Sequence, residues 1–129
     1  MAGERDLTSL LRSLAPAIDD QEYTFATAGE LDVAKVKRPV GVFREEEGLT
    51  VICRCDEAEF LGLKHEGRFR RIVLTVHSSL EAVGLTACVS GALADAGISC
   101  NVVAGFYHDY LFVPEHRASE ALAILRSLR

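Results

Sequence analysis

The sequence lacks the features that would indicate several common classes of function. No lysine or arginine occurs between Arg71 and Arg117, and the net charge of the whole chain is −5. Proteins bind nucleic-acid phosphates with clustered basic side chains, so we expect no nucleic-acid partner. The first residues contain no apolar signal core, and no apolar run is long enough to span a bilayer. We therefore expect a cytoplasmic protein that does not enter a membrane.

Paired-cysteine motifs are absent as well. Cys53, Cys55, Cys88 and Cys100 form no CxxC pair, and the four histidines are scattered without the spacing of metal ligands. We expect free, buried thiols, with Cys53 and Cys55 on one face of a strand. No metal and no other cofactor is predicted, because a zinc site would need two more soft ligands near this pair.

The 129 residues, 49% of them hydrophobic, suffice for one compact core or for two small subdomains. In the first half, Asp6 is an N-cap for a short helix, and the alternation of apolar residues predicts strands at 22–28, 40–46 and 49–55. Asp56 and Glu59 have the spacing of a capping box for a helix that Gly62 ends. The polar segment 63–67 is the expected boundary between the halves.

The second half repeats this order of elements. An apolar strand at 72–76 precedes a helix that ends at Gly97, and strands at 98–106 and 110–113 precede a final helix at 115–128. The pattern predicts an α+β fold of two tandem ferredoxin-like units, residues 1–66 and 67–129, with antiparallel sheets and helices on one face of each. No strand follows the last helix. We therefore expect a strand from the other half or from another subunit to cover that sheet edge.

Two runs of the second half resemble the ACT domain family. They are His77-Ser-Ser-Leu-Glu-Ala-Val-Gly-Leu-Thr86 and Asn101-Val-Val-Ala-Gly-Phe-Tyr-His-Asp-Tyr-Leu-Phe-Val-Pro114, joined by a helix rich in small residues. The chain resembles small bacterial proteins built from two ACT-like units. The resemblance implies a non-enzymatic regulatory or sensor protein that binds a small molecule of the amino-acid class. It also implies a homodimer formed through sheet edges or helices.

The resemblance places the ligand at the loop after the first strand of the second unit. The ligand-binding residues it implies are Ser78, Ser79, Glu81, Val83, Gly84, Leu85, Asn101 and Asp109. Where ACT domains usually carry Asp-Arg-Pro-Gly or a near variant, this loop has the run that begins at His77, which leaves the identity of the ligand open. Backbone N–H groups at a helix start favour an anion such as a carboxylate.

Other interpretations of the same residues remain open. Ser78 and Glu81 have the spacing of a capping box, so they are also explained as a helix cap. Asn101 is also explained by an edge hydrogen bond or a bulge. His77, His108 and Asp109 offer acid–base groups for an enzyme, although a polar turn between two strands explains the last two. An interaction module without a ligand is the remaining alternative.

Overall fold

The computed structural model describes residues 6–76 and 83–129. Contacts divide the chain into two compact units. We call Gln21–Phe69 the inserted unit, and we call the chain up to Asp20 together with Arg70–Arg129 the split unit. The sequence placed the leading helix with the first half of the chain. Its contacts instead group it with the second half, because its leucines join the core of the split unit.

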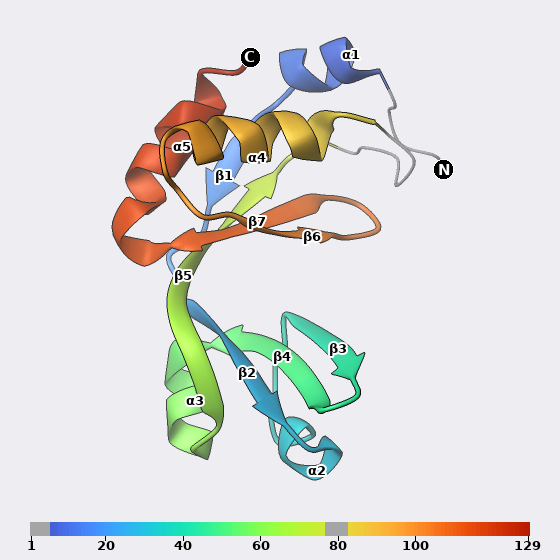
Figure 1. Cartoon of the computed structure of the whole chain (residues 1–129), viewed down its shortest axis with the longest axis vertical. Coiled ribbons are helices and arrows are strands. Elements are labelled where there is room, and N and C mark those ends of the chain that lie inside the picture. The colour runs from blue at the N-terminus through green and yellow to red at the C-terminus, as the bar shows by residue number, and fades with distance from the viewer. Residues whose placement is uncertain (1–5, 77–82) are drawn as a thin grey trace. The chain divides into compact units, whose positions relative to one another are not determined.

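The inserted unit has the strand–helix–strand–strand–helix–strand order of a ferredoxin-like fold. Its elements are β2 (Tyr23–Ala28), α2 (Glu30–Val33), β3 (Gly41–Glu45), β4 (Gly48–Arg54), α3 (Cys55–Leu61) and the first part of β5 (Lys64–Leu74). The strands pair in the order β3-β4-β2-β5, and every pair is antiparallel (Figure 1).

Alternate residues of these strands form the core of the inserted unit. Ala26, Val51 and Cys53 pack with Val33 of α2 and Ala58 of α3, so both helices lie against the same face of the sheet. Thr24 is fully buried beside the point where β2 shifts register against β5, and its hydroxyl donates to the Glu66 carbonyl at 2.9 Å.

The split unit is built from the chain segments that precede and follow the inserted unit in the sequence. Its elements are α1 (Leu7–Arg12), β1 (Pro16–Ile18), the last part of β5, α4 (Leu85–Asp95), β6 (Asn101–Ala104), β7 (Asp109–Pro114), the 3-10 turn η1 (Glu115–Arg117) and α5 (Ala118–Arg126). The strand order is β1-β5-β7-β6. Figure 1 shows α4 and α5 on one side of the β6–β7 hairpin.

The strand β1 occupies the place of the fourth strand that the second half lacks. It pairs with β5 in antiparallel register, with Pro16 opposite Leu74 and Ile18 opposite Ile72. Leu10 and Leu14, which precede it, are buried in the same core as the apolar faces of α4, α5 and β7. The sheet edge is therefore covered by a strand from the same chain, and the core of the split unit depends on residues far apart in the sequence.

Several predicted helix ends are confirmed by backbone geometry. Asp6 caps α1, and its carboxylate accepts from the Ser9 backbone N–H at 3.0 Å. Gly62 and Gly97 follow α3 and α4 with φ of 67° and 73°, respectively. That left-handed conformation is easily adopted by glycine and satisfies carbonyl groups at a helix end.

Other local features differ from what the sequence pattern suggested. The polar segment 63–67, expected at the boundary between the halves, lies mostly within strand β5, which runs from Lys64 to Leu74. No capping box joins Asp56 and Glu59, because α3 already begins at Cys55 and its N-cap, Arg54, makes no side-chain cap bond. Cys53 and Cys55 consequently lie on different elements rather than on one strand.

Candidate functional site

The residues predicted to bind a ligand fall into two groups. Ser78, Ser79 and Glu81 lie outside the described residues, as does His77 of the enzyme alternative, whereas five predicted ligand contacts lie within them. These five are Val83, Gly84, Leu85, Asn101 and Asp109. All five belong to the split unit, so the geometry of the candidate site is that of one unit.

The start of α4 presents backbone donors without a side-chain cap. Gly84 is the N-cap, with φ of 100° and ψ of −20°, and no side-chain hydrogen bond caps the helix. The Gly84 carbonyl accepts from the Cys88 N–H at 2.8 Å, which closes the first turn. The first turn contains no acidic residue. N–H groups at such a helix end attract an anion because they are free and because the helix dipole points toward them.

The side chains around this N-cap have opposite roles. Leu85 is 2% exposed and belongs to the core, so only its backbone is available to a ligand. Val83, by contrast, is 82% exposed. The buried Leu85 side chain anchors the start of α4 in the core, whereas the exposed Val83 lies beside a Gly84 backbone near the surface.

The β6–β7 turn lies beside the segment that leads toward this helix. His108 Nδ1 is 3.2 Å from the Val76 carbonyl oxygen, and the Gly105 N–H donates to the His108 carbonyl at 2.9 Å. Asp109 follows at the start of β7 and is 8% exposed. Its side chain shares the helix-facing side of β7 with Leu111, because alternate residues of a strand point the same way.

Asn101 lies elsewhere on the same hairpin. It is exposed at the start of β6 and stands opposite Phe112, whereas Asp109 stands opposite Ala104. The two positions are three residues apart along the strand, which corresponds to about 10 Å. The structure therefore brings His108 close to Val76 and places Asn101 at the other end of the hairpin from Asp109.

Two aromatic residues in the turn were not predicted as site residues. Phe106 and Tyr107 are 66% and 64% exposed, and their rings meet edge to face with centroids 4.9 Å apart. Large exposed aromatic side chains at a turn commonly take part in binding. The sequence signal was the adjacent pair of aromatic residues, which a turn between two strands does not require.

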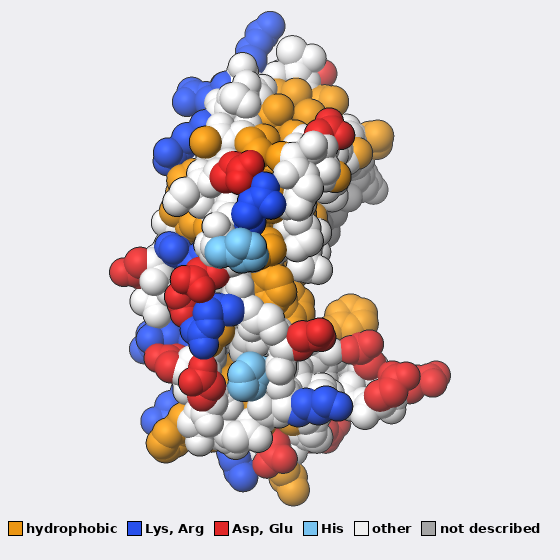
Figure 2. Space-filling model, turned by 60° about the vertical axis from the view of Figure 1, so that its left-hand side comes forward, with side chains coloured by type: hydrophobic (Ala, Val, Ile, Leu, Met, Phe, Trp, Pro, Cys, Tyr) orange, Lys and Arg blue, Asp and Glu red, His pale blue; other side chains and the backbone are white. Residues whose placement is uncertain are grey.

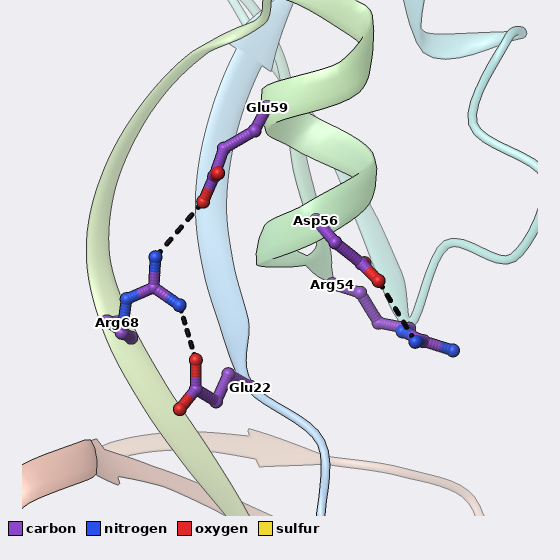
Figure 3. Close-up of polar contacts among 5 residues, drawn as sticks. All are labelled: Glu22, Arg54, Asp56, Glu59 and Arg68. Atoms are coloured by element: carbon purple, nitrogen blue, oxygen red, sulfur yellow. Dashed lines mark hydrogen bonds and ion pairs between the residues drawn. The ribbon is translucent and has the colours of Figure 1, made fainter.

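Basic side chains of the inserted unit form ion pairs with acidic side chains of neighbouring elements. Figure 3 shows Arg68 between Glu22 and Glu59, with Arg68–Glu59 at 3.0 Å, and a second pair between Arg54 and Asp56 at 3.1 Å.

Within the split unit, Arg71 pairs with Asp19 at 3.0 Å and lies over the Tyr110 ring, 5.5 Å from its centroid. Acidic and basic side chains are interspersed over the face that Figure 2 presents. Exposed pairs of this kind contribute little stability, so the pairs found here describe an ordinary charged surface.

The cysteines show no sign of metal or redox chemistry in the described part of the chain. All four thiols are free. Burial raises the pKa of Cys53 to about 11, and Glu57 adds to the shift. Across residues 6–76 and 83–129, no group of three or more His, Cys, Asp or Glu side chains could hold a metal ion. None of the helices in these ranges has the length and apolar character needed to cross a membrane.

Comparison with known proteins identifies chains of similar fold. The chain is similar to a Vibrio cholerae protein of unknown function, described as a possible transport protein, with 42% identity, 92% of each chain covered and a TM-score of 0.83. It resembles an Agrobacterium tumefaciens protein at 18% identity over 89% of this chain and 88% of that one, with a TM-score of 0.69.

The regulatory subunit of aspartate kinase from Thermus thermophilus has the same fold at 12% identity, with a TM-score of 0.67 over 91% of this chain and 97% of that one. No curated protein sequence matches the chain. Two family models, both described as ACT domain, match residues 2–70 and 68–127. The chain therefore belongs to the ACT domain family and contains two such domains in tandem.

Proposed function

We propose that this chain is a non-enzymatic regulatory protein that binds an amino acid at the start of α4. The observation that carries the proposal is the N-cap at Gly84, where backbone N–H groups of an 11-residue helix meet no side-chain cap. A ligand carboxylate placed there would accept from these groups and would interact favourably with the helix dipole. The proposed site is the loop Ser78–Leu85.

The α-amino group of such a ligand needs a carboxylate partner. Asp109 is assigned this role, together with Glu81 of the loop. Support for Asp109 comes from its place beside His108, whose ring contacts the chain at Val76, directly before residues 77–82. A carboxylate that is only 8% exposed would interact more strongly with an ammonium group than an exposed carboxylate would. Asn101 is assigned to a contact with a neighbouring ligand, because it lies apart from Asp109 along the hairpin.

Proteins of similar fold support an amino acid as the class of ligand. They include aspartokinase III from E. coli, whose crystal structure is in complex with aspartate and ADP, and regulatory subunits of aspartate kinase. At 14% identity or less these similarities concern the fold alone. The identity of the amino acid is consequently left to experiment.

A thermal-shift screen against the amino acids, with nucleotides as a second panel, tests the proposal. A hit is then titrated by calorimetry against variants of the loop. Because backbone N–H groups would provide most of the contact, Ser78→Ala and Ser79→Ala should each weaken binding by about 1 kcal/mol. Ser127→Ala, an exposed serine directly after α5, is the matched control and should bind as the wild type does.

The alternatives give different results in the same experiments. If no amino acid shifts the melting temperature and the screen is otherwise silent, the chain is an interaction module. If a ligand is consumed and His108→Ala abolishes turnover while binding persists, the chain is an enzyme that uses His77, His108 and Asp109. Equal affinity of the wild type and both serine variants, measured beside their stability, would move the site away from this loop.

A further inference from the structure

A groove of about 520 Å³ lies in the inserted unit, between α3 and the segment that joins α2 to β3. Its volume is within the range of about 300–1,000 Å³ that is usual for small-molecule sites. The lining residues are Lys35, Lys37, Arg38, Arg54, Asp56, Glu57, Phe60 and Leu61. All of them belong to the inserted unit, so the groove is separate from the candidate site at the start of α4.

Burial and a hydrogen bond hold the two walls of the groove together. Val36, which is 5% exposed, anchors the joining segment in the core of the inserted unit and leaves Lys35 and Lys37 exposed on either side of it. The Lys37 backbone N–H donates to the Glu57 carboxylate at 2.7 Å. Residues three positions apart are neighbours on a helix surface, so Phe60 lies beside Glu57. The joining segment is thus held against the side of α3 that carries Phe60.

The groove carries an excess of positive charge, although the net charge of the whole chain is −5. Four of its side chains are cationic and two are anionic. Lys35 and Arg54 are paired with nearby carboxylates at 3.2 Å and 3.1 Å, and Figure 3 draws the second pair. Lys37 and Arg38 make no ion pair with any described residue. Two adjacent cations are therefore left for an anionic ligand.

Phe60 adds an exposed aromatic ring to this charged groove. Its side chain is 89% exposed, whereas Cys55 and Ala58 form the buried face of α3. The core of the unit therefore does not use this ring. Planar rings stack favourably on aromatic side chains, as nucleic-acid bases do in many proteins. A cationic pair and a free aromatic ring in one groove match a ligand with one anionic end and one planar end.

We propose that this groove binds a small organic phosphate that carries a planar ring, which is the chemistry of a nucleotide. Lys37 and Arg38 donate charge-assisted hydrogen bonds to the phosphate oxygens, and the ring of the ligand stacks on Phe60. Phosphate is favoured over carboxylate because its charge of up to −2 matches two unpaired cations. The inference does not rest on amino-acid binding at α4, which belongs to the other unit.

Calorimetric titration of the full chain with ATP, GTP and AMP tests the proposal. At least one of them should bind at low salt, and binding should weaken as ionic strength rises because exposed charges are screened. The matching nucleoside and inorganic triphosphate each supply one half of the ligand, so each should bind about tenfold or more weakly than the best nucleotide. The proposal is overturned if no nucleotide binds at millimolar concentration, or if inorganic triphosphate binds as tightly as the best nucleotide.

Charge reversal locates the phosphate end of the site. K37E/R38E should weaken nucleotide binding by about tenfold or more, because it removes both cations assigned to the phosphate. R126E/R129E makes the same change in net charge on exposed residues of the other unit, and this matched control should bind as the wild type does. Unchanged affinity in K37E/R38E would overturn the proposal. An equal loss in the control would do so too, because net charge alone would then explain the effect.

Removal of the aromatic ring tests the planar end. Phe60→Ala should weaken nucleotide binding by about fivefold or more, whereas binding of inorganic triphosphate should not change. Phe43→Ala is the matched control, because Phe43 is 72% exposed in the same unit and does not line the groove. Equal affinities of the Phe60 and Phe43 variants for the nucleotide would overturn the stacking role and with it the proposal.

Glu57→Gln should change the affinity in the opposite direction. Its amide oxygen can still accept from the Lys37 N–H, but the negative charge in the groove is lost, so nucleotide affinity should rise about two- to fivefold. A fall in affinity at an unchanged melting temperature would contradict the assigned electrostatics and overturn the proposal. Titration of the same variants with an amino acid found in the screen should match the wild type, which separates failure of this site from failure of the site at α4.

Discussion

Gly84 at the start of α4 lies directly against Leu7 of α1: a Cβ atom added to the glycine would lie 3.1 Å from Leu7 Cδ2. The glycine also has φ of 100°, a conformation that other residues rarely adopt. The backbone geometry thus favours glycine at this position, and a Cβ would also require the end of the Leu7 side chain to shift slightly. The contact joins the proposed ligand loop to the helix that precedes the inserted unit.

Substitution of Gly84 should destabilise the protein before any effect on a ligand is considered. We expect Gly84→Ala to lower the free energy of unfolding by about 1–3 kcal/mol, because a non-glycine residue is strained there. Gly84→Val should cost more, since its branch meets Leu7. Urea denaturation measures both, and Gly91→Ala in the same helix is the control. A Cβ at Gly91 meets no atom within 4 Å, so that variant should be about 0.5–1 kcal/mol more stable than the wild type.

Combining Gly84→Ala with Leu7→Ala separates the two causes. If the clash between the new Cβ and Leu7 contributes, Gly84→Ala should lower the free energy of unfolding by less in the Leu7→Ala background than in the wild type. The loss that remains in that background measures the backbone strain. A Gly84→Ala protein as stable as the wild type would contradict the geometry of this N-cap. Any ligand affinity measured for a Gly84 variant must be read beside this stability.

Leu14 should be essential to the core of the split unit although it precedes the inserted unit in the chain. It is fully buried among residues of that core, so Leu14→Ala should lower the free energy of unfolding by about 2–5 kcal/mol. Leu31→Ala, at an 85% exposed position on α2, should change it by less than about 0.5 kcal/mol. Equal effects in chemical denaturation would show that α1 and β1 do not pack as described.

Thr24 should stabilise the inserted unit through its hydroxyl rather than through its volume. Its Oγ donates to the Glu66 carbonyl, and the side chain is fully buried. Thr24→Val keeps the shape but leaves that carbonyl without this donor, so we expect a loss of about 1–3 kcal/mol in the free energy of unfolding. Thr27→Val, at an exposed position of the same strand, is the matched control and should be nearly neutral. A neutral Thr24→Val would mean that another donor replaces the hydroxyl.

Cys53 should be the slowest of the cysteines to react in the native protein. It is fully buried and its pKa is raised to about 11, so little thiolate forms at pH 8 and no reagent reaches it. Cys88 and Cys100 are partly exposed and should react earlier, although burial also raises the pKa of Cys100. Timed labelling followed by mass spectrometry of peptides measures the order. Rapid labelling of Cys53 in a folded sample would contradict its burial.

The raised pKa of the Cys53 thiol should also make the stability of the protein depend on pH in the alkaline range. Below the pKa of an unfolded thiol, about 8.5, Cys53 is protonated in both states and its contribution to stability is fully present. Above it, the unfolded chain releases the proton while the folded protein keeps it up to about pH 11. The free energy of unfolding should therefore fall as pH rises from about 9 to 11, and Cys53→Ala should reduce that slope. An unchanged slope in the variant would assign the loss to other groups.

Local signals were sufficient to predict much of each unit from the sequence. Asp6 starts a helix, and Gly62 and Gly97 end two others, because caps and left-handed glycines act over a few residues. The alternation of apolar residues predicted the hairpin of β3 and β4 and that of β6 and β7. The repeated order of these elements predicted two ferredoxin-like units, and the resemblance of two runs in the second half indicated the ACT family.

Contacts between distant segments decided the rest. Pro16–Ile18 gave no strand signal of its own, since three residues beside a proline become a strand only where β5 offers an edge. The polar start of β5 is a strand because β2 pairs with it, although its side chains suggested a boundary. Likewise, the sequence supplied Asn101, His108 and Asp109 as candidates, but only the pairing register of β6 and β7 separates the first from the other two. Pairing energy is shared between strands far apart in the chain, so no single segment encodes it.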